Sequence, residues 1–150
     1  MIRKYAFALT VAALLILGYS RLTSAETSSD LTGTWVFHIT VTGASPCECI
    51  QILSLHADSS LEGPGNDQFT GQARGIWAKT GPNKLSFTVA QNGFNHDGSA
   101  AGLYTISGAM NLTGPGAGSG ISSFILTNNS GATLTSGKAA FTATRLRLLP

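Results

Sequence analysis

Histidine and cysteine are the residue types in this sequence whose side chains could carry out catalysis or bind a metal. The three histidines are His38, His56 and His96. His96 is followed by Asp97, but adjacent side chains in a turn usually point apart, so a catalytic dyad is not expected. The spacing of the histidines and cysteines matches no structural zinc signature, and no serine lies in a nucleophile-elbow context. The sequence therefore predicts no catalytic residue, no metal ligand and no cofactor.

The two cysteines, Cys47 and Cys49, are separated by a single residue. Residues two apart in a straight strand are too far apart for a disulfide, so a bond between them needs a bent backbone. Pro46 favours such a bend. The pair is open to three interpretations: an internal disulfide, free or intermolecular thiols, and a metal or redox role.

The beginning of the chain has the pattern of a secretory signal peptide. Arg3 and Lys4 give a positively charged start, and residues 5–19 form an apolar run. Thr23-Ser24-Ala25 then offers small residues at a cleavage site. The apolar run is shorter than the ~20 residues that a membrane-spanning helix needs. We therefore expect a signal peptide over residues 1–25, a secreted or periplasmic protein, and no stable membrane anchor after cleavage.

The remaining residues, 26–150, are expected to form one domain. They carry six lysines and arginines against seven aspartates and glutamates, which is a net charge of about −1. No basic stripe remains to attract the phosphates of a nucleic acid or an anionic membrane surface. Nucleic acids are therefore not expected as partners.

Segments in which apolar and polar side chains alternate dominate this domain. In the first of them Trp35, Phe37 and Ile39 share one face, and a period of two is typical of a half-buried strand. No segment of the domain has helical spacing. The sequence predicts an all-β fold, an antiparallel up-and-down barrel of seven to eight strands, with a β-sandwich as the alternative. The expected strands cover 34–42, 50–57, 68–78, 84–90, 102–112, 121–127, 132–135 and 138–148.

Two glycine-rich stretches between these strands are predicted as turns. Residues 58–67 contain Gly63-Pro64-Gly65-Asn66, a strong turn signal. Residues 114–120 superficially resemble a phosphate-binding loop, but they lack its lysine and no helix follows them. We expect this second stretch to be a flexible hairpin tip.

Gly33-Thr34-Trp35, at the start of the first strand, resembles the Gly-x-Trp motif of lipocalins and other calycins. The resemblance implies a calycin-like barrel in which an arginine of the last strand packs over Trp35, with Arg145 in that role and Arg147 as the alternate. The combination of Gly75-Ile76-Trp77 with Thr80-Gly81-Pro82-Asn83 also resembles a group of small secreted bacterial barrels of unassigned function.

The middle of such a barrel decides whether it can hold a ligand. In the predicted strand 68–78, small residues lie between Phe69 and Trp77 on one face. If this face points inward, the waist is either hollow, which favours an apolar ligand, or filled by bulky neighbours. The neighbours that could fill it are Phe37, Phe87 and Phe141.

The function expected from these observations is a binding module for a small apolar molecule. One alternative is a small-barrel enzyme, such as an isomerase or cyclase, with Tyr104 and His56 as its polar groups. Another is a filled barrel that acts through its surface as an envelope or interaction protein. Enzyme activity is the less favoured interpretation. The predicted ligand-binding residues are Trp35, Phe37, Trp77, Phe87, Tyr104 and Phe141, with Arg145 closing one end.

Overall fold

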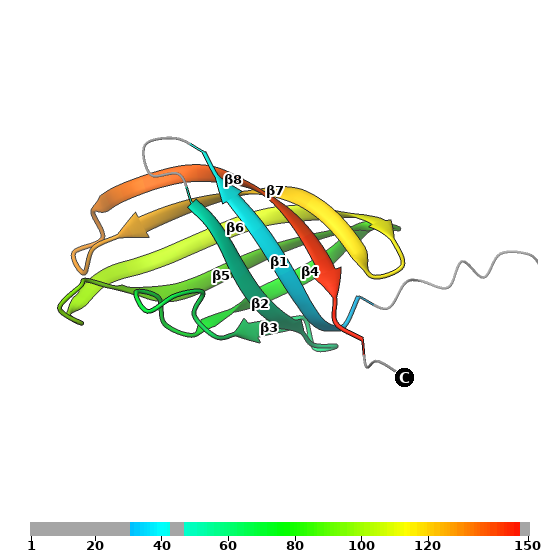
Figure 1. The fold of residues 1–150 in the computed structure, drawn as a ribbon, viewed down its shortest axis with the longest axis horizontal. Coiled ribbons are helices and arrows are strands. Elements are labelled where there is room, and N and C mark those ends of the chain that lie inside the picture. The colour runs from blue at the N-terminus through cyan, green and yellow to red at the C-terminus, as the bar shows by residue number, and fades with distance from the viewer. Residues whose placement is uncertain (1–30, 43–46, 148–150) are drawn as a thin grey trace, which may run out of the picture. The chain divides into compact units, whose positions relative to one another are not determined.

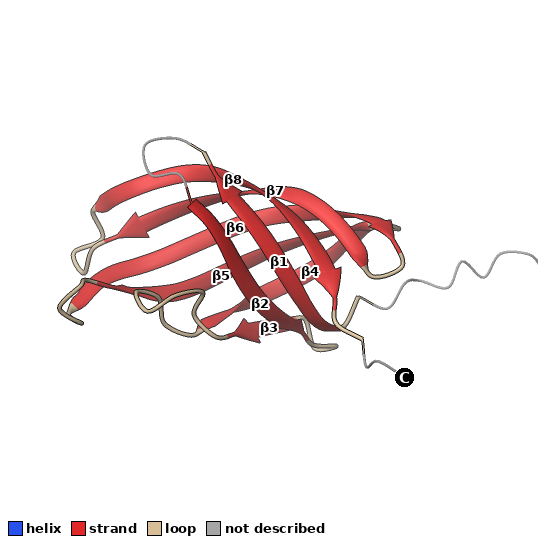
Figure 2. Ribbon diagram, in the orientation of Figure 1, coloured by secondary structure: helices blue, strands red, loops and turns tan. Residues whose placement is uncertain are grey.

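The computed structural model of the protein describes residues 31–42 and 47–147, with the backbone alone for Cys47. In this part of the chain eight antiparallel strands form a closed barrel, in which each strand pairs with the next and β8 pairs with β1 (Figures 1 and 2). The predicted all-β up-and-down barrel is confirmed, and closure excludes the sandwich. The strands are β1 (Gly33–Val41), β2 (Cys47–Leu55), β3 (Ser60–Gly63), β4 (Ala73–Gly81), β5 (Lys84–Phe94), β6 (Ala100–Gly114), β7 (Ala117–Thr127) and β8 (Thr133–Arg145).

The expected signal peptide over 1–25 and the start of the domain at residue 26 lie outside the described residues. No helix in the described part of the chain has the length and apolar character needed to cross a membrane.

The alternation of side chains in β1 places its apolar face inside the barrel. Trp35 and Phe37 are buried, whereas His38 and Thr40, on the other face, are exposed. The predicted inward face of the first strand is confirmed, because successive side chains of a strand point to opposite sides of the sheet.

β3 lies in a stretch that the sequence predicts as a turn. It is four residues long and contributes one buried side chain, Leu61, which is the register partner of Gly75 in β4. Because β3 has only one inward apolar side chain, its sequence shows no alternation that would predict a strand.

Conversely, the sequence predicts a strand over 68–78, but β4 begins at Ala73. Residues 69–71 still bond to the end of β5, since Phe94 N–H donates to Phe69 O and Gly71 N–H donates to Asn92 O, both at 2.7 Å. The Asp67 carboxylate, which accepts from Phe69 N–H and from the Thr70 hydroxyl, shapes the start of this stretch into a turn.

The glycine-rich stretch 114–120 contains the predicted hairpin tip, but most of the stretch belongs to strands. Only Pro115 and Gly116 form the turn, and β7 begins at Ala117. Gly118 lies against Met110, where a Cβ would come within 2.8 Å of the sulfur. These glycines therefore serve close packing between strands. The segments predicted as 132–135 and 138–148 are likewise a single strand, β8.

The turns alternate between the two ends of the barrel because the strands run up and down in chain order. We call the end with the start of β1, the end of β8 and the β2–β3, β4–β5 and β6–β7 turns the closed end (Figure 1). The opposite end, with the β5–β6 and β7–β8 turns and the segment 64–72, is the open end.

Candidate functional site in the barrel interior

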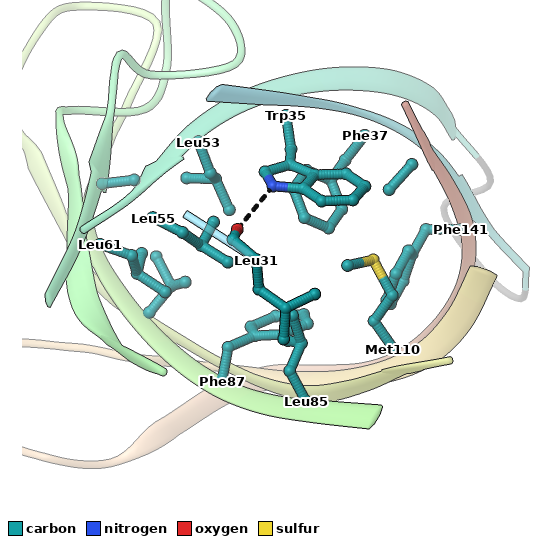
Figure 3. Packing of buried hydrophobic residues seen from close by; sticks show 13 residues of the cluster. Leu31, Trp35, Phe37, Leu53, Leu55, Leu61, Leu85, Phe87, Met110 and Phe141 are labelled. Atoms are coloured by element: carbon teal, nitrogen blue, oxygen red, sulfur yellow. Dashed lines mark hydrogen bonds between the residues drawn. The ribbon is translucent and has the colours of Figure 1, made fainter. Parts of the chain in front are cut away.

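Trp35 plugs the closed end. Its side chain is 1% exposed, and the indole Nε1–H donates a hydrogen bond to the backbone carbonyl of Leu31 at 3.0 Å (Figure 3). Leu31, Leu85 and Met110 belong to the same buried cluster and leave almost no surface exposed. The indole therefore closes one end of the barrel.

Arg145 lies beside this plug on β8. It is the register partner of Trp35, and its Nε is 3.0 Å from the position that a Cβ on Gly33 would occupy. Gly33 also has a φ of +117°, which residues other than glycine rarely adopt. Both observations explain the glycine of the Gly-x-Trp segment. Arg147, the alternate, donates instead to the carbonyl of Pro115 at 2.6 Å.

Three phenylalanine rings, Phe37, Phe87 and Phe141, fill the middle of the barrel, which we call the waist. Their centroids lie 5.4 to 6.1 Å apart in tilted or edge-to-face contacts. Phe87 and Phe141 each lie over a glycine of a neighbouring strand, Gly108 and Gly120, where an added Cβ would be 2.6 Å from the ring. Of the two alternatives left open by the sequence, the structure has the filled waist.

A cavity of about 50 Å³ adjoins the waist. Sites for whole drug-sized ligands measure ~300–1,000 Å³, whereas a single water needs ~10–15 Å³ on this scale. The cavity therefore has room for a few waters or for one chemical group of a larger molecule. Its walls are the waist phenylalanines, four aliphatic side chains, and the polar side chains of Gln51, Asn66, Gln91 and Ser122.

Two of these polar residues, Gln51 and Gln91, are buried in the barrel interior. Gln51 is 6% exposed, and its Nε2 donates to the carbonyl of Pro64 at 2.6 Å, which ties the segment after β3 to the cavity. Gln91 is 4% exposed, and its Oε1 has no hydrogen-bond partner among the described residues. Sequence reasoning missed both. Their position in the alternating pattern was the available signal. Gln51 lies two residues from the inward-facing Leu53, and Gln91 lies two residues from the inward-facing Val89, so each shares the face of its apolar neighbour.

Solvent reaches the interior on the open side of the waist. Ile39, Ile106 and Ser122 line the cavity yet are only half-buried. Farther toward the open end, the rings of Tyr104 and Phe124 lie with centroids 6.5 Å apart and are also half-buried. The barrel is thus sealed at the closed end and accessible at the open end.

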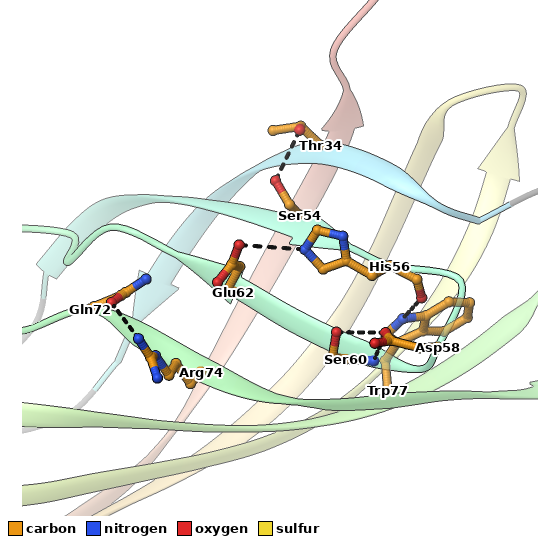
Figure 4. Close-up of polar contacts among 9 residues, drawn as sticks. All are labelled: Thr34, Ser54, His56, Asp58, Ser60, Glu62, Gln72, Arg74 and Trp77. Carbon is orange, nitrogen blue, oxygen red and sulfur yellow. Dashed lines mark hydrogen bonds and ion pairs between the residues drawn. The ribbon is translucent and has the colours of Figure 1, made fainter.

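The predicted ligand-binding residues are distributed over different parts of the barrel. Phe37, Phe87 and Phe141 meet at the cavity. Trp35 and Arg145 lie at the closed end, and Tyr104 lies on the open side of the waist. The indole of Trp77 donates to the carbonyl of His56 at 2.9 Å, so it packs against the β2–β3 turn (Figure 4).

The remaining polar groups that could do chemistry lie on the surface. His56 Nε2 is 3.6 Å from Glu62 Oε1 in an exposed pair at the closed end (Figure 4). His96 contacts the ring of Phe69 edge-on, whereas Asp97 accepts a hydrogen bond from the Ser99 hydroxyl, so the two neighbours have different partners. Within the described ranges no three histidine, cysteine or acidic side chains are placed to hold a metal ion.

Hydrogen bonds from serine hydroxyls lower the pKa of two turn carboxyls. Ser60 Oγ donates to Asp58 at 2.6 Å, and its backbone N–H adds a second bond, so the pKa of Asp58 lies below its usual 3.8. Ser99 acts in the same way on Asp97 and lowers the pKa of that carboxyl too. Both carboxyls are fully exposed, so these bonds shape turns and create no reactive group.

Cys49 is disulfide-bonded, and its backbone lies opposite Ile39 of β1. The side chain of Cys47 lies outside the described residues. The pairing of these two cysteines therefore stays a prediction.

No family model matches the chain, and no curated protein shows significant similarity to it. The closed eight-stranded antiparallel barrel is compatible with a calycin-like fold.

Proposed function

We propose that this protein is a secreted or periplasmic binding module that takes up a small, largely apolar molecule through the open end of its barrel. The observation that carries the proposal is the asymmetry of the interior. The closed end and the waist are filled, whereas several inward-facing residues beyond the waist, among them Ile39, Ile106 and Tyr104, are half-buried. A small cavity lies between the two regions. A pocket that has aromatic rings at its base and is open on one side suits a ligand that enters from solvent and buries apolar surface.

The size of the cavity limits how such a ligand binds. About 50 Å³ admits one group of the molecule, not the whole of it. The rest of the ligand would lie along Ile39 and Ile106 toward Tyr104. We therefore expect a ligand that inserts one end.

Acid–base catalysis receives less support from this interior. The buried polar side chains at the cavity, Gln51 and Gln91, are amides, which neither gain nor lose a charge near neutral pH. Of the two polar groups of the enzyme alternative, His56 lies at the closed end and is 45% exposed. Tyr104 is half-buried on the open side of the waist and is not among the residues that line the cavity. The geometry therefore favours binding over a proton-transfer reaction.

A second candidate function, as an interaction protein, is favoured by one feature of the outer face. Ile121 is 72% exposed and borders a surface hollow of about 490 Å³, together with Ala109, Ala140 and Lys138. Exposed apolar side chains around a hollow are typical of contact surfaces.

Isoleucine methyl groups separate the two candidates, because they lie on both sides of the barrel wall. Titration with para-ethylphenol should shift the NMR methyl signals of Ile39 and Ile106 and leave those of Ile121 and Ile125 in place. Shifts confined to Ile121 and Ile125 would favour the outer surface, and no saturable shift would overturn the proposed function.

A matched pair of variants locates the site further. Ser122→Leu places a larger side chain in the cavity, whereas Ser123→Leu makes the same change at an exposed position. We expect Ser122→Leu to weaken binding at least about tenfold, equivalent to about 1.4 kcal/mol, and Ser123→Leu to leave it unchanged. Equal affinities in the two variants would contradict the interior site.

A further inference from the structure

We propose that Gln91 gives the cavity a hydrogen-bond acceptor for a donor group of the ligand, so that the ligand is an amphiphile such as an alcohol or a phenol, not a hydrocarbon. This inference rests on the proposed function, and it names the chemical class of molecule that the same site would select.

The unpaired oxygen of Gln91 is the first observation. The residue is 4% exposed, and its Oε1 accepts no hydrogen bond from any part of the chain that the structure describes. Buried polar atoms are nearly always paired in folded proteins, because an unpaired one has lost water without a replacement. An orphaned acceptor that lines a cavity is therefore a place for a donor that is not part of the chain.

Gln51 shows that the unpaired state is particular to Gln91. Both glutamines line the same cavity, but Gln51 Nε2 donates to Pro64 O at 2.6 Å and to Ile52 O at 3.3 Å. These bonds direct the NH2 group of Gln51 to the backbone. One amide thus helps to hold the wall of the cavity, and the other presents a vacant acceptor.

The surroundings of Gln91 explain why its acceptor would discriminate between ligands. Its neighbours in phase on β5 are Phe87 and Val89, and Ile106 borders the same cavity. Beside these apolar side chains a ligand hydroxyl group gains a hydrogen bond to Oε1, whereas a methyl group of the same size leaves Oε1 unpaired. Sites that present a buried acceptor reject analogues that lack the donor for this reason.

Water is compatible with this assignment. A cavity of about 50 Å³ with several polar walls is large enough for ordered water. A water molecule that donates to Gln91 Oε1 occupies the position of the ligand hydroxyl, and a hydroxyl that reproduces its hydrogen bond can displace it without loss. A methyl group cannot.

The test compares two ligands of equal shape, para-ethylphenol and para-ethyltoluene, on the native protein and on Gln91→Met. Methionine is similar in length to glutamine but lacks the amide acceptor. Calorimetric titration should show that the native protein prefers the phenol, and that Gln91→Met reduces this preference about tenfold. Gln72→Met, the same change at an exposed position of the chain, should leave the preference unchanged.

The outcomes distinguish failure of this inference from failure of the proposed function. If both ligands bind and Gln91→Met leaves their affinity ratio unchanged, the acceptor role is overturned and the binding module stands. If neither ligand binds the native protein, the proposed function falls and this inference with it. A native preference for para-ethyltoluene would also overturn the acceptor role.

A second measurement needs no variant. In 15N-labelled native protein, para-ethylphenol should shift the side-chain amide signals of Gln91 more than those of the exposed Gln72, and para-ethyltoluene should shift them less. Equal shifts with the two ligands would overturn the inference.

Discussion

The closed end and the cavity beside the waist use the same barrel wall in opposite ways. At the closed end the polar atom of Trp35 is satisfied inside the fold by Leu31, and almost nothing is exposed. At the cavity, Gln91 is also buried but its Oε1 has no partner among the described residues, and Ile39 and Ile106, which line the same cavity, are half-buried. The first arrangement maximises stability, whereas the second keeps a polar atom that a more stable core would replace.

Removal of the plug should have the largest effect on stability. Trp35→Ala should lower the free energy of unfolding by about 3–5 kcal/mol, because the lost indole leaves a cavity in a fully buried cluster. Phe124→Ala should lower the free energy of unfolding clearly less, because Phe124 lies on the open side of the waist and is only half-buried. Urea denaturation of both variants measures the difference, and equal losses would break the distinction between the two regions.

Substitution of the glycines beneath the aromatic rings should have the second largest effect on stability. Gly108→Ala would place a Cβ 2.6 Å from the ring of Phe87 and 3.0 Å from the carbonyl of Ile121, so we expect a loss of about 1–3 kcal/mol from overpacking. Gly114→Ala is the control, since a Cβ there meets nothing within 4 Å. An unchanged melting temperature of Gly108→Ala would contradict this expectation and show that the side chains of the waist can move to accommodate the added methyl group.

The two buried glutamines should respond in opposite directions. Gln91→Met should raise the free energy of unfolding by about 1 kcal/mol, because it removes a buried acceptor that has no partner. Gln51→Met should lower the free energy of unfolding by about 1 kcal/mol, because it removes the hydrogen bond to Pro64. Chemical denaturation of the two variants tests the contrast. A destabilised Gln91→Met would mean that its amide is already satisfied.

The smallest effects concern the turn carboxyls, which should behave alike at both ends. Asp58 lies in the β2–β3 turn and Asp97 in the β5–β6 turn, and serine hydrogen bonds lower the pKa of each. A lowered folded-state pKa gives a stability contribution that is present above the unfolded-state pKa of about 3.8 and is lost as the pH falls through the folded-state value. NMR titration should show that Ser60→Ala and Ser99→Ala each raise the pKa of the nearby carboxyl. Unchanged pKa values of Asp58 and Asp97 in these variants would show that the serine hydroxyls do not cause the lowered pKa.

The sequence was sufficient for the barrel because its longer strands repeat the same signal. Alternation in β1 and β5 identifies inward faces, and closely spaced turn residues predict an up-and-down order. β3 could not be found, because Leu61 alone faces the interior and one residue has no period. The glycines at 118 and 120 were misread because their role depends on Met110 and Phe141, which lie on neighbouring strands.

The candidate site was less accessible to sequence reasoning than the fold. Phe37, Phe87 and Phe141, which the sequence predicts to line a pocket, do border the cavity, but their rings also fill the waist and keep that cavity small. The polar residues that mark the cavity, Gln51 and Gln91, lie in phase with buried apolar residues and could have been noticed. That Gln91 lacks a partner could not, since it depends on the distance to every neighbouring donor.

The pairing of β1 with β8 has a consequence for how the chain folds. Every other strand pair joins segments that are close in sequence, and this pair alone joins the first strand to the last. Contacts of such high sequence separation form late, so β1 has a free edge until β8 has been synthesised. A chain that stops before β8 would therefore leave two unpaired edges, which invite association with other chains, and would not form a smaller barrel.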